Sequence, residues 1–359
     1  MEQMNINPVR CSLRNIICHQ PLHEIEALMR KSLMCLAVLQ IFAWSCKSRS
    51  PAGLEEVLHL DVRGWAHSVA LYGGSIYIAA REGGFTVFDG SRGYRETRHA
   101  LPIRDVISLS PDSGMTVLAA SFEGLVVVSP DGRIIDRCTI GKIVNAVEAR
   151  GNYVFAAGGP LGLVVAQLAQ GHLRLANSLP TKGWSHDLRL SRDQVLLADW
   201  NYGLRVVDIR DPQNPAEIAT LPSPATCISL AVREEDRDTR MLALAEGHAG
   251  ISLVRLDAAG QPVFVGRNYL GLNPGDAAHP EKGGWVHGVA WANRYLFAAN
   301  WKRGMAVLDT LHPENPRVVQ EIPTSGTSLA VKTQLQPDGS YLIFLADGES
   351  GLRIFRFRY

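Results

Sequence analysis

Short apolar strands separated by turn residues recur along most of the chain, and their alternating apolar and polar positions indicate β-structure. In each copy an apolar strand ends in Ala, and a Gly five positions later opens the next apolar strand. The copies pair Ala79 with Gly84, Ala119 with Gly124, Ala157 with Gly162, Ala198 with Gly203, Ala245 with Gly250, Ala299 with Gly304 and Ala346 with Gly351. A spacing that recurs seven times predicts seven equivalent structural units.

Successive repeat glycines are 40, 38, 41, 47, 54 and 47 residues apart. A period of this length, made of short strands and turns, is typical of a β-propeller with four strands in each blade. The repeat Gly is expected at a turn position with positive φ, and the repeat Ala where neighbouring blades leave little room. We therefore predict an all-β fold, a seven-bladed β-propeller with four-stranded blades, over residues 54–359.

The two ends of the repeat region predict how the ring closes. The seventh copy stops after the strand at 351–357 and lacks an outer strand, whereas residues 54–60 supply one strand to spare. If this N-terminal strand completes the last blade, both open sheet edges disappear.

The segment before the repeats contains a different kind of apolar stretch. Basic residues at 30–31 precede a run of thirteen mostly apolar residues at 33–45. That length is too short for a membrane anchor but suits the core of a signal peptide. We predict a signal peptide at 29–46 and a polar tether at 47–53. Residues 1–28 are interpreted as an upstream start-codon artefact.

Cys46 ends the apolar run in a context that resembles a bacterial lipobox. The family pattern favours Leu three positions before the Cys and a small residue two before, whereas this chain has Ala43 and Trp44. We predict lipidation of Cys46, with an ordinary export signal cleaved nearby as the alternative. The expected location is the cell envelope, as an outer-membrane or cell-surface lipoprotein that meets the membrane only through its anchor.

Composition and charge narrow the classes of partner. Hydrophobic residues make up 46% and charged residues 20% of the chain, as expected for an ordered protein. Thirty-six basic residues against thirty-five acidic ones leave no electrostatic footprint for nucleic acid. Cys138 and Cys227 lie in different repeats, which indicates neither a disulfide framework nor a metal cluster, and both are expected to be buried.

A Gly-Trp-x-His motif occurs three times, at 64–67, 183–186 and 284–287, each time with its His seventeen residues before the repeat Gly. His67, His186 and His287 are therefore expected at the start of the innermost strand of blades one, four and six, converging on the channel axis. The pattern aligns with them Asp105, Asn145, Ile228 and Thr327.

These three histidines and Asp105 are a candidate site for a divalent metal such as zinc. The alternative is structural, because a Gly-His dipeptide at this connection in WD-repeat propellers hydrogen-bonds within its own blade.

Tryptophans gather on the same predicted face of the disk, at the turns beside the innermost strands. Aromatic side chains at exposed turns with interspersed polar groups are typical of binding surfaces. The predicted ligand-binding residues are Trp65, Trp184, Trp200, Trp285, Trp301, Asp199 and Asn300. The expected ligand is a protein, a glycan or a small molecule. Alternatively, the tryptophans cap the hydrophobic gaps between blades.

Several segments resemble the repeat of the LVIVD-repeat family of bacterial and archaeal surface proteins. They are the strands at 295–300 and 203–209 and the Asp-Pro-Gln-Asn-Pro turn at 211–215, with a weaker turn of this type at 312–316. The resemblance covers residues 57–359 and is best in the fourth and sixth copies. It implies an exported propeller and no shared activity.

No motif of a known catalytic class is present: the chain has no Walker loop and no nucleophile elbow, so catalytic residues stay unassigned. The favoured interpretation is a non-catalytic binding module. The alternatives are a metal-dependent enzyme, with the three histidines as ligands and Asp105 or a turn carboxylate as base, and a scaffold without a ligand.

Overall fold

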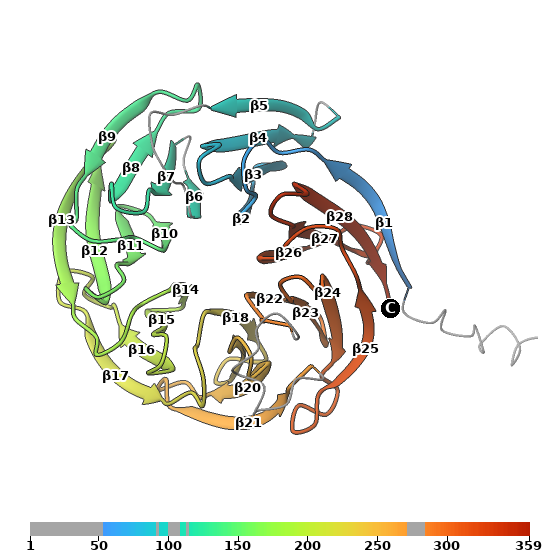
Figure 1. The fold of residues 1–359 in the computed structure, drawn as a ribbon. Helices are drawn as coiled ribbons and strands as arrows, with labels where there is room; N and C mark the ends of the chain where they lie inside the picture. The colour runs from blue at the N-terminus through green and yellow to red at the C-terminus, as the bar shows by residue number, and fades with distance from the viewer. Residues whose placement is uncertain (1–52, 91–92, 100–107, 113–114, 271–283) are drawn as a thin grey trace, which may run out of the picture. The chain divides into compact units, whose positions relative to one another are not determined.

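The protein is described by a computed structural model that covers residues 53–90, 93–99, 108–112, 115–270 and 284–359. These residues form seven antiparallel sheets of four strands, arranged as a ring (Figure 1). The predicted seven-bladed β-propeller is therefore confirmed. Cys46, the predicted signal peptide and most of the predicted tether lie outside the described residues. No helix in the described ranges is long and apolar enough to span a membrane.

Strands follow chain order from the channel outward in the first four blades. Blade one consists of β2 (Ser68–Tyr72), β3 (Ser75–Ala79), β4 (Phe85–Asp89) and β5 (Arg95–His99). Blade two consists of β6 (Ser108–Asp112), β7 (Met115–Ala119), β8 (Leu125–Val128) and β9 (Ile134–Cys138). Blade three consists of β10 (Ala146–Arg150), β11 (Tyr153–Ala157), β12 (Leu163–Ala169) and β13 (His172–Leu179). Blade four consists of β14 (Asp187–Ser191), β15 (Gln194–Ala198), β16 (Leu204–Asp208) and β17 (Ala216–Leu221).

The remaining blades repeat this plan, with one exception at the junction of the chain ends. Blade five consists of β18 (Ser229–Glu234), β19 (Arg240–Ala245), β20 (Ile251–Leu256) and β21 (Pro262–Asn268). Blade six consists of β22 (Gly288–Ala292), β23 (Tyr295–Ala299), β24 (Met305–Asp309) and β25 (Arg317–Ile322). Blade seven consists of β26 (Ala330–Leu335), β27 (Tyr341–Ala346), β28 (Leu352–Arg358) and, as its outer strand, β1 (Gly53–Leu60).

The N-terminal strand closes the ring, as predicted. Strand β1 hydrogen-bonds to β28, so the first described strand and the last one share a sheet (Figure 1). An ion pair of 2.9 Å between Arg353 and Glu56 links the two strands through their side chains. This pairing covers the outer edge of β28 and leaves all seven blades with four strands.

The hydrophobic core is divided among the seven junctions between blades. Each of the seven clusters of buried side chains joins two neighbouring blades and no more. Between blades three and four, for example, Phe155 and Leu163 pack with Leu188 and Val195. Neighbouring sheets thus bury each other's faces around the ring, which holds the innermost strands in fixed positions beside the channel.

The repeated Ala and Gly have the roles expected of them. All seven repeat alanines have no exposed surface, so no larger side chain fits at these blade junctions. All seven repeat glycines have φ between 73° and 90°, a region that L-residues with a Cβ avoid. Space also excludes a side chain, because a Cβ added at Gly203 would lie 2.2 Å from the carbonyl oxygen of Leu221. Both reasons explain the fixed spacing.

Candidate functional site

The three motif histidines meet in the channel. The ring centroids of His67 and His287 are 5.9 Å apart, and those of His186 and His287 are 6.0 Å apart. Both pairs are close to perpendicular, with interplanar angles of 87° and 72°. The predicted convergence of these side chains from blades one, four and six is therefore confirmed.

Two of these histidines form hydrogen bonds with the backbone of the next blade. The Nδ1 atom of His186 lies 3.0 Å from the carbonyl oxygen of Ile228 in blade five. Since a carbonyl oxygen only accepts, Nδ1 carries the hydrogen and Nε2 of a neutral ring keeps its lone pair. His287 hydrogen-bonds to the backbone of Leu329, the matching residue of blade seven. The structural alternative had expected such bonds within one blade, whereas they join neighbouring blades.

The environment of His186 and His287 favours their neutral form. Burial holds the pKa of His287 well below its usual value, and the nearby His67 and His186 lower it further. Burial also lowers the pKa of His186, although the charge of Asp187 acts in the opposite direction. Neutral imidazoles both donate and accept hydrogen bonds, so they suit contacts with polar, uncharged ligand groups.

Two of the predicted tryptophans lie directly against the histidines. The rings of Trp200 and His186 have their centroids 5.4 Å apart, and those of Trp301 and His287 stack at 5.9 Å with an interplanar angle of 24°. Both tryptophans have positive φ, 47° and 50°. Gly159 occupies the corresponding turn position in blade three, with φ of 56°. We call His67, His186, His287, Trp200 and Trp301 the channel mouth.

The tryptophans of the Gly-Trp-x-His motifs instead cover junctions between blades. Trp184 packs over Gly159 of the preceding blade, where an added Cβ would lie 3.2 Å from its Cε2. Trp285 lies over Gly247 and Trp65 over Gly348 in the same way. These three positions fit the capping alternative, although 41% of Trp184 remains exposed. Their predicted contact with a ligand stays a prediction.

The side chains of Asp199 and Asn300 point into the protein interior and not towards solvent. Asp199 has no exposed surface and accepts hydrogen bonds from Thr181 Oγ1 and Arg205 Nε, both at 2.8 Å. Asn300 is 1% exposed, and its side-chain amide lies against Gly284. Both side chains therefore brace the connection that leads into their blade. Their predicted role in ligand binding is not supported by any open surface.

The metal prediction is not favoured by this geometry. Among the residues that the structure describes, no group of three or more His, Cys, Asp or Glu side chains could hold a metal ion. Asp105 lies outside the described residues. In blade seven, Leu329 and not Thr327 occupies the position of the histidines, because Leu329 N bonds to Ala346 O as His186 N bonds to Ala198 O.

The two cysteines of the repeat region are unpaired. Cys227 is fully buried, as expected, and burial raises the pKa of its thiol well above the usual value. Cys138 is only half-buried.

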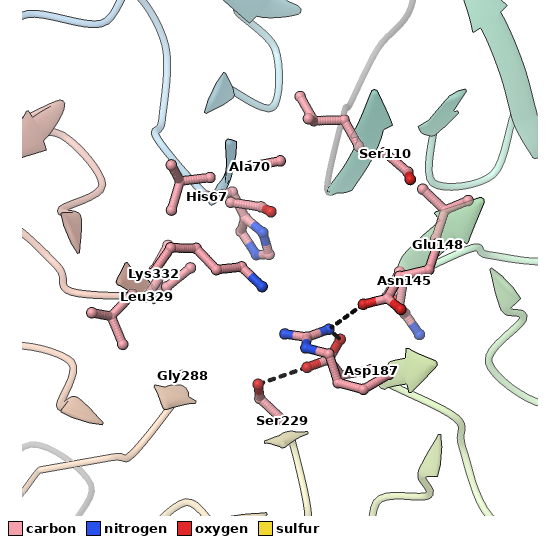
Figure 2. A pocket seen from close by; sticks show the side chains of 18 of the residues that line it. His67, Ala70, Ser110, Asn145, Glu148, Asp187, Ser229, Gly288, Leu329 and Lys332 are labelled. Carbon is pink, nitrogen blue, oxygen red and sulfur yellow. Dashed lines mark hydrogen bonds and ion pairs between the residues drawn. The ribbon is translucent and has the colours of Figure 1, made fainter. Parts of the chain in front are cut away.

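A cavity of about 420 Å³ lies in the channel, bounded by residues of all seven blades. Among the described residues, the charged side chains that line it are Glu148, Asp187, Arg189 and Lys332. Figure 2 shows Glu148, Asp187 and Lys332 reaching into this space from different blades. None of these residues belongs to a motif that the sequence pattern indicated. Glu148, Arg189 and Lys332 each lie three positions after the residue that matches a motif histidine, which is the signal that was missed.

Arg189 is at the centre of a hydrogen-bonded cluster. Its Nη1 lies 2.7 Å from Asp187 Oδ1 and 3.6 Å from Glu148 Oε1. Ser229 Oγ donates to the other oxygen of Asp187 at 2.6 Å. Burial alone would raise the pKa of Asp187, but Arg189 and Ser229 outweigh it and lower the value. For Glu148, burial prevails over the nearby cations and raises the pKa.

Lys332 stands apart from this cluster. No hydrogen bond or ion pair joins it to any of the described residues. The positive charge of Arg189, followed by burial, lowers the pKa of Lys332 to about 8, although the charges of Glu148 and Asp187 act in the opposite direction. At neutral pH its ammonium group is therefore mostly charged and without a direct counterion.

Closed blades around a histidine-lined channel define the chain as a seven-bladed β-propeller. Residues 63–91 and 182–221 match the family model of the LVIVD repeat, so these two segments are similar to the repeat that the sequence resembles. No curated protein gives a significant match.

Solved structures with low identity share the fold. The β-propeller domain of Cps50 (Swd1) from Myceliophteria thermophila is 13% identical, with 86% of this chain and 100% of that chain covered and a TM-score of 0.63. The RRP9 WD40 repeats are 12% identical over 86% of this chain and 100% of theirs, with a TM-score of 0.65. The computationally designed Ika8 protein is 12% identical over 84% and 99%, with a TM-score of 0.58. Such identities show the fold alone.

Proposed function

We propose that this protein is an exported, lipid-anchored binding module that takes its ligand at the channel mouth. The observation that carries the proposal is the meeting of His67, His186 and His287, with the rings of Trp200 and Trp301 set against two of them. Stacked rings with polar edges offer apolar area together with hydrogen bonds at a low cost in side-chain entropy. A propeller can build such a site because each blade contributes one position to a common axis.

The tryptophans at the channel mouth support binding because the fold does not require them. Blades three, five and seven have Gly159, Gly247 and Gly348 at the turn position where blades four and six have Trp200 and Trp301. A non-glycine residue with positive φ costs about 1 kcal/mol of backbone strain. Arg81 and Ser121 also have positive φ at this position in blades one and two, so strain alone does not single out the tryptophans. Their distinguishing feature is the contact of their rings with His186 and His287.

A direct test replaces Trp200 by Gly. The Trp200→Gly variant removes the ring and relieves the positive φ, so we expect it to fold at least as stably as the unchanged protein. Both proteins are screened by surface plasmon resonance against immobilised glycans, small molecules and candidate proteins. We expect at least one ligand whose affinity falls about tenfold or more in the variant, as for the loss of a central aromatic contact.

The matched control is Tyr72→Ala. Tyr72 is 42% exposed and ends β2, at the opposite end of the innermost strand from His67. Its removal should leave every such affinity unchanged. If no ligand discriminates Trp200→Gly from the unchanged protein, or if Tyr72→Ala has the same effect, the proposed binding surface is wrong.

Export and lipidation have a test of their own. Cells that express the full chain are fed an alkyne-labelled fatty acid, and the protein is recovered from membrane and soluble fractions. We expect label and membrane association for the unchanged chain and for Cys35→Ser, and neither for Cys46→Ser. Unlabelled protein released from the cells in all three cases would favour an ordinary signal cleaved nearby.

A further inference from the structure

Charged residues are unevenly distributed around the channel wall: they occupy one equivalent position of the innermost strand in blades three, four and seven. The strand register shows that these positions are equivalent. Glu148 pairs with Phe155, Arg189 with Leu196 and Lys332 with Phe344, each time between the first and second strands of the blade. We call this position the charged level of the channel. Blades three and four, which are neighbours, thus place their acid and base together. Lys332 lies in blade seven, and the blades on either side of it have Ala290 and Ala70 at this level.

In the described strands of both neighbouring blades, Lys332 therefore has no acid at this level, and the charges of Glu148 and Asp187 attract it only from other blades. The carboxylates of Glu148 and Asp187 already have partners. Both form ion pairs with Arg189, and they accept hydrogen bonds from Ser229 and from the backbone N–H groups of Leu188 and Leu190. An ammonium group removed from bulk water without a direct partner is unfavourable. The part of the cavity next to Lys332 is therefore complementary to an anion.

We propose that the channel cavity binds the carboxylate group of a small organic acid, with Lys332 as the cation that recognises it. This assignment deepens the proposed function by naming a ligand class, and it rests on that function only in taking the channel to be a binding site. Ser110 offers a further donor, because its hydroxyl oxygen accepts from Ala149 N while no described acceptor takes its hydrogen.

The rest of the cavity limits the charge and the body of this ligand. Glu148 and Asp187 line the same space, so a second negative charge on the ligand would be repelled. The walls combine apolar and uncharged polar groups, because Ala70 and Ala330 line the cavity together with Ser110, Thr333 and the three motif histidines. A volume of about 420 Å³ admits a molecule of the size of a substituted benzoate. These features favour a monocarboxylate with an uncharged body over inorganic phosphate.

Isothermal titration calorimetry on the purified full chain tests this proposal with defined probes. Acetate and benzoate are compared with acetamide and benzamide, which have similar shapes but no charge, and with inorganic phosphate. We expect at least one carboxylate to bind about tenfold or more tightly than its amide, as is usual when a hydrogen bond to a charged group is lost. This comparison needs no variant, so it does not depend on any substitution being tolerated.

Variants then locate the site. Lys332→Met keeps the length of the side chain and removes the repulsion with Arg189, so it should fold and lose carboxylate binding about tenfold or more. Lys302→Met is the matched control, because Lys302 is an exposed lysine paired with Glu349 outside the cavity. It should leave binding unchanged.

The results that would overturn the proposal are equally specific. They are an absence of binding by both carboxylates, equal binding of acid and amide, a preference for phosphate, and undiminished binding in Lys332→Met. Failure of the channel mouth proposal would look different, because Trp200→Gly would then change no affinity in the ligand screen while carboxylates still required Lys332.

Discussion

Arg353 and Glu56 are 297 residues apart in the chain, yet Arg353 Nη1 lies 2.9 Å from Glu56 Oε2. The same arrangement occurs inside blade four, where Arg205 Nη1 lies 2.7 Å from Glu217 Oε2. In both blades the arginine follows the repeat Gly by two positions, and the glutamate comes from the outer strand. The N-terminal strand therefore reproduces in blade seven the side-chain pairing of a continuous blade.

Removing the charge of Glu56 should weaken this closure. For Glu56→Gln we expect the free energy of unfolding to fall by about 0.5–1 kcal/mol, the range for a partly exposed ion pair. Urea denaturation followed by circular dichroism measures the difference. Glu321→Gln is the control, because its pair with Arg303 is longer, at 3.5 Å, and more exposed. If both variants lose the same free energy of unfolding, the pair between Arg353 and Glu56 stabilises the fold no more than an exposed surface pair does.

Replacing Asp199 should lower the stability of the folded protein. Its pair with Arg205 is almost fully buried, with side-chain exposures of 0% and 8%. Asp199→Ala leaves a buried guanidinium with one partner fewer, so we expect a loss of about 3 kcal/mol in the free energy of unfolding. Asp131→Ala removes an exposed pair of the same kind and should cause no measurable change. A stable Asp199→Ala protein with reduced ligand affinity would instead restore the binding role predicted from the sequence.

Alanine variants of two glycines with the same φ should distinguish the cost of backbone strain from the cost of overpacking. Gly151 and Gly159 both have φ of 56°, but an added Cβ meets nothing within 4 Å at Gly151 and lies 2.8 Å from Ile143 Cγ2 at Gly159. Gly151→Ala should cost about 1 kcal/mol from strain alone. Gly159→Ala should cost about 1–3 kcal/mol more from overpacking. It should also shift the fluorescence of Trp184, which lies over this glycine.

Equal thermal midpoints for the two glycine variants would contradict this prediction. They would show that Trp184 moves aside freely and does not cap the junction between blades three and four.

Acid should destabilise the channel through its histidines. The pKa of His287 lies below its unfolded value, near 6.5. The unfolded chain therefore binds a proton in a pH range where the folded protein does not. Stability is thus full above the unfolded pKa and falls as the pH drops towards the folded one, by at most about 1.4 kcal/mol per pH unit for this group.

Urea midpoints at pH 7.5 and 5.5 test the role of His287. We expect the loss between the two pH values to be smaller in His287→Gln than in the unchanged protein. His312→Gln, which changes an exposed histidine, should keep the full loss. An identical loss in all three proteins would show that His287 does not contribute to the pH dependence.

Much of the fold could be predicted because the repeat leaves physical marks on the sequence. The invariant Ala and Gly follow from blade packing and from a backbone angle, so their spacing defines seven units without a known relative. The unmatched strand at 54–60 likewise predicted the closure, since a four-stranded last blade needs it. These features depend on local geometry, which sequence spacing records directly.

The site was harder to predict because it depends on alignment between blades of unequal length. Taking Thr327 as the counterpart of the histidines shifted blade seven by two residues, which concealed that Lys332 lies level with Arg189. Gly326 would have corrected this, because it packs on Asp347 as Gly183 packs on Asp199. Whether a side chain such as Asp199 points to solvent or to its own blade is a tertiary property that spacing does not record.

Closure by the first strand also constrains the order of assembly. Strand β1 finds its partner only when β28 exists, so the earliest segment of the propeller must wait for nearly the whole chain. Contacts so distant in sequence form late and slowly, after the local pairings within blades. Until then the ring has two open sheet edges that can pair with other chains. A chain that stops short within blade seven would keep that hazard, since its first strand could never be covered.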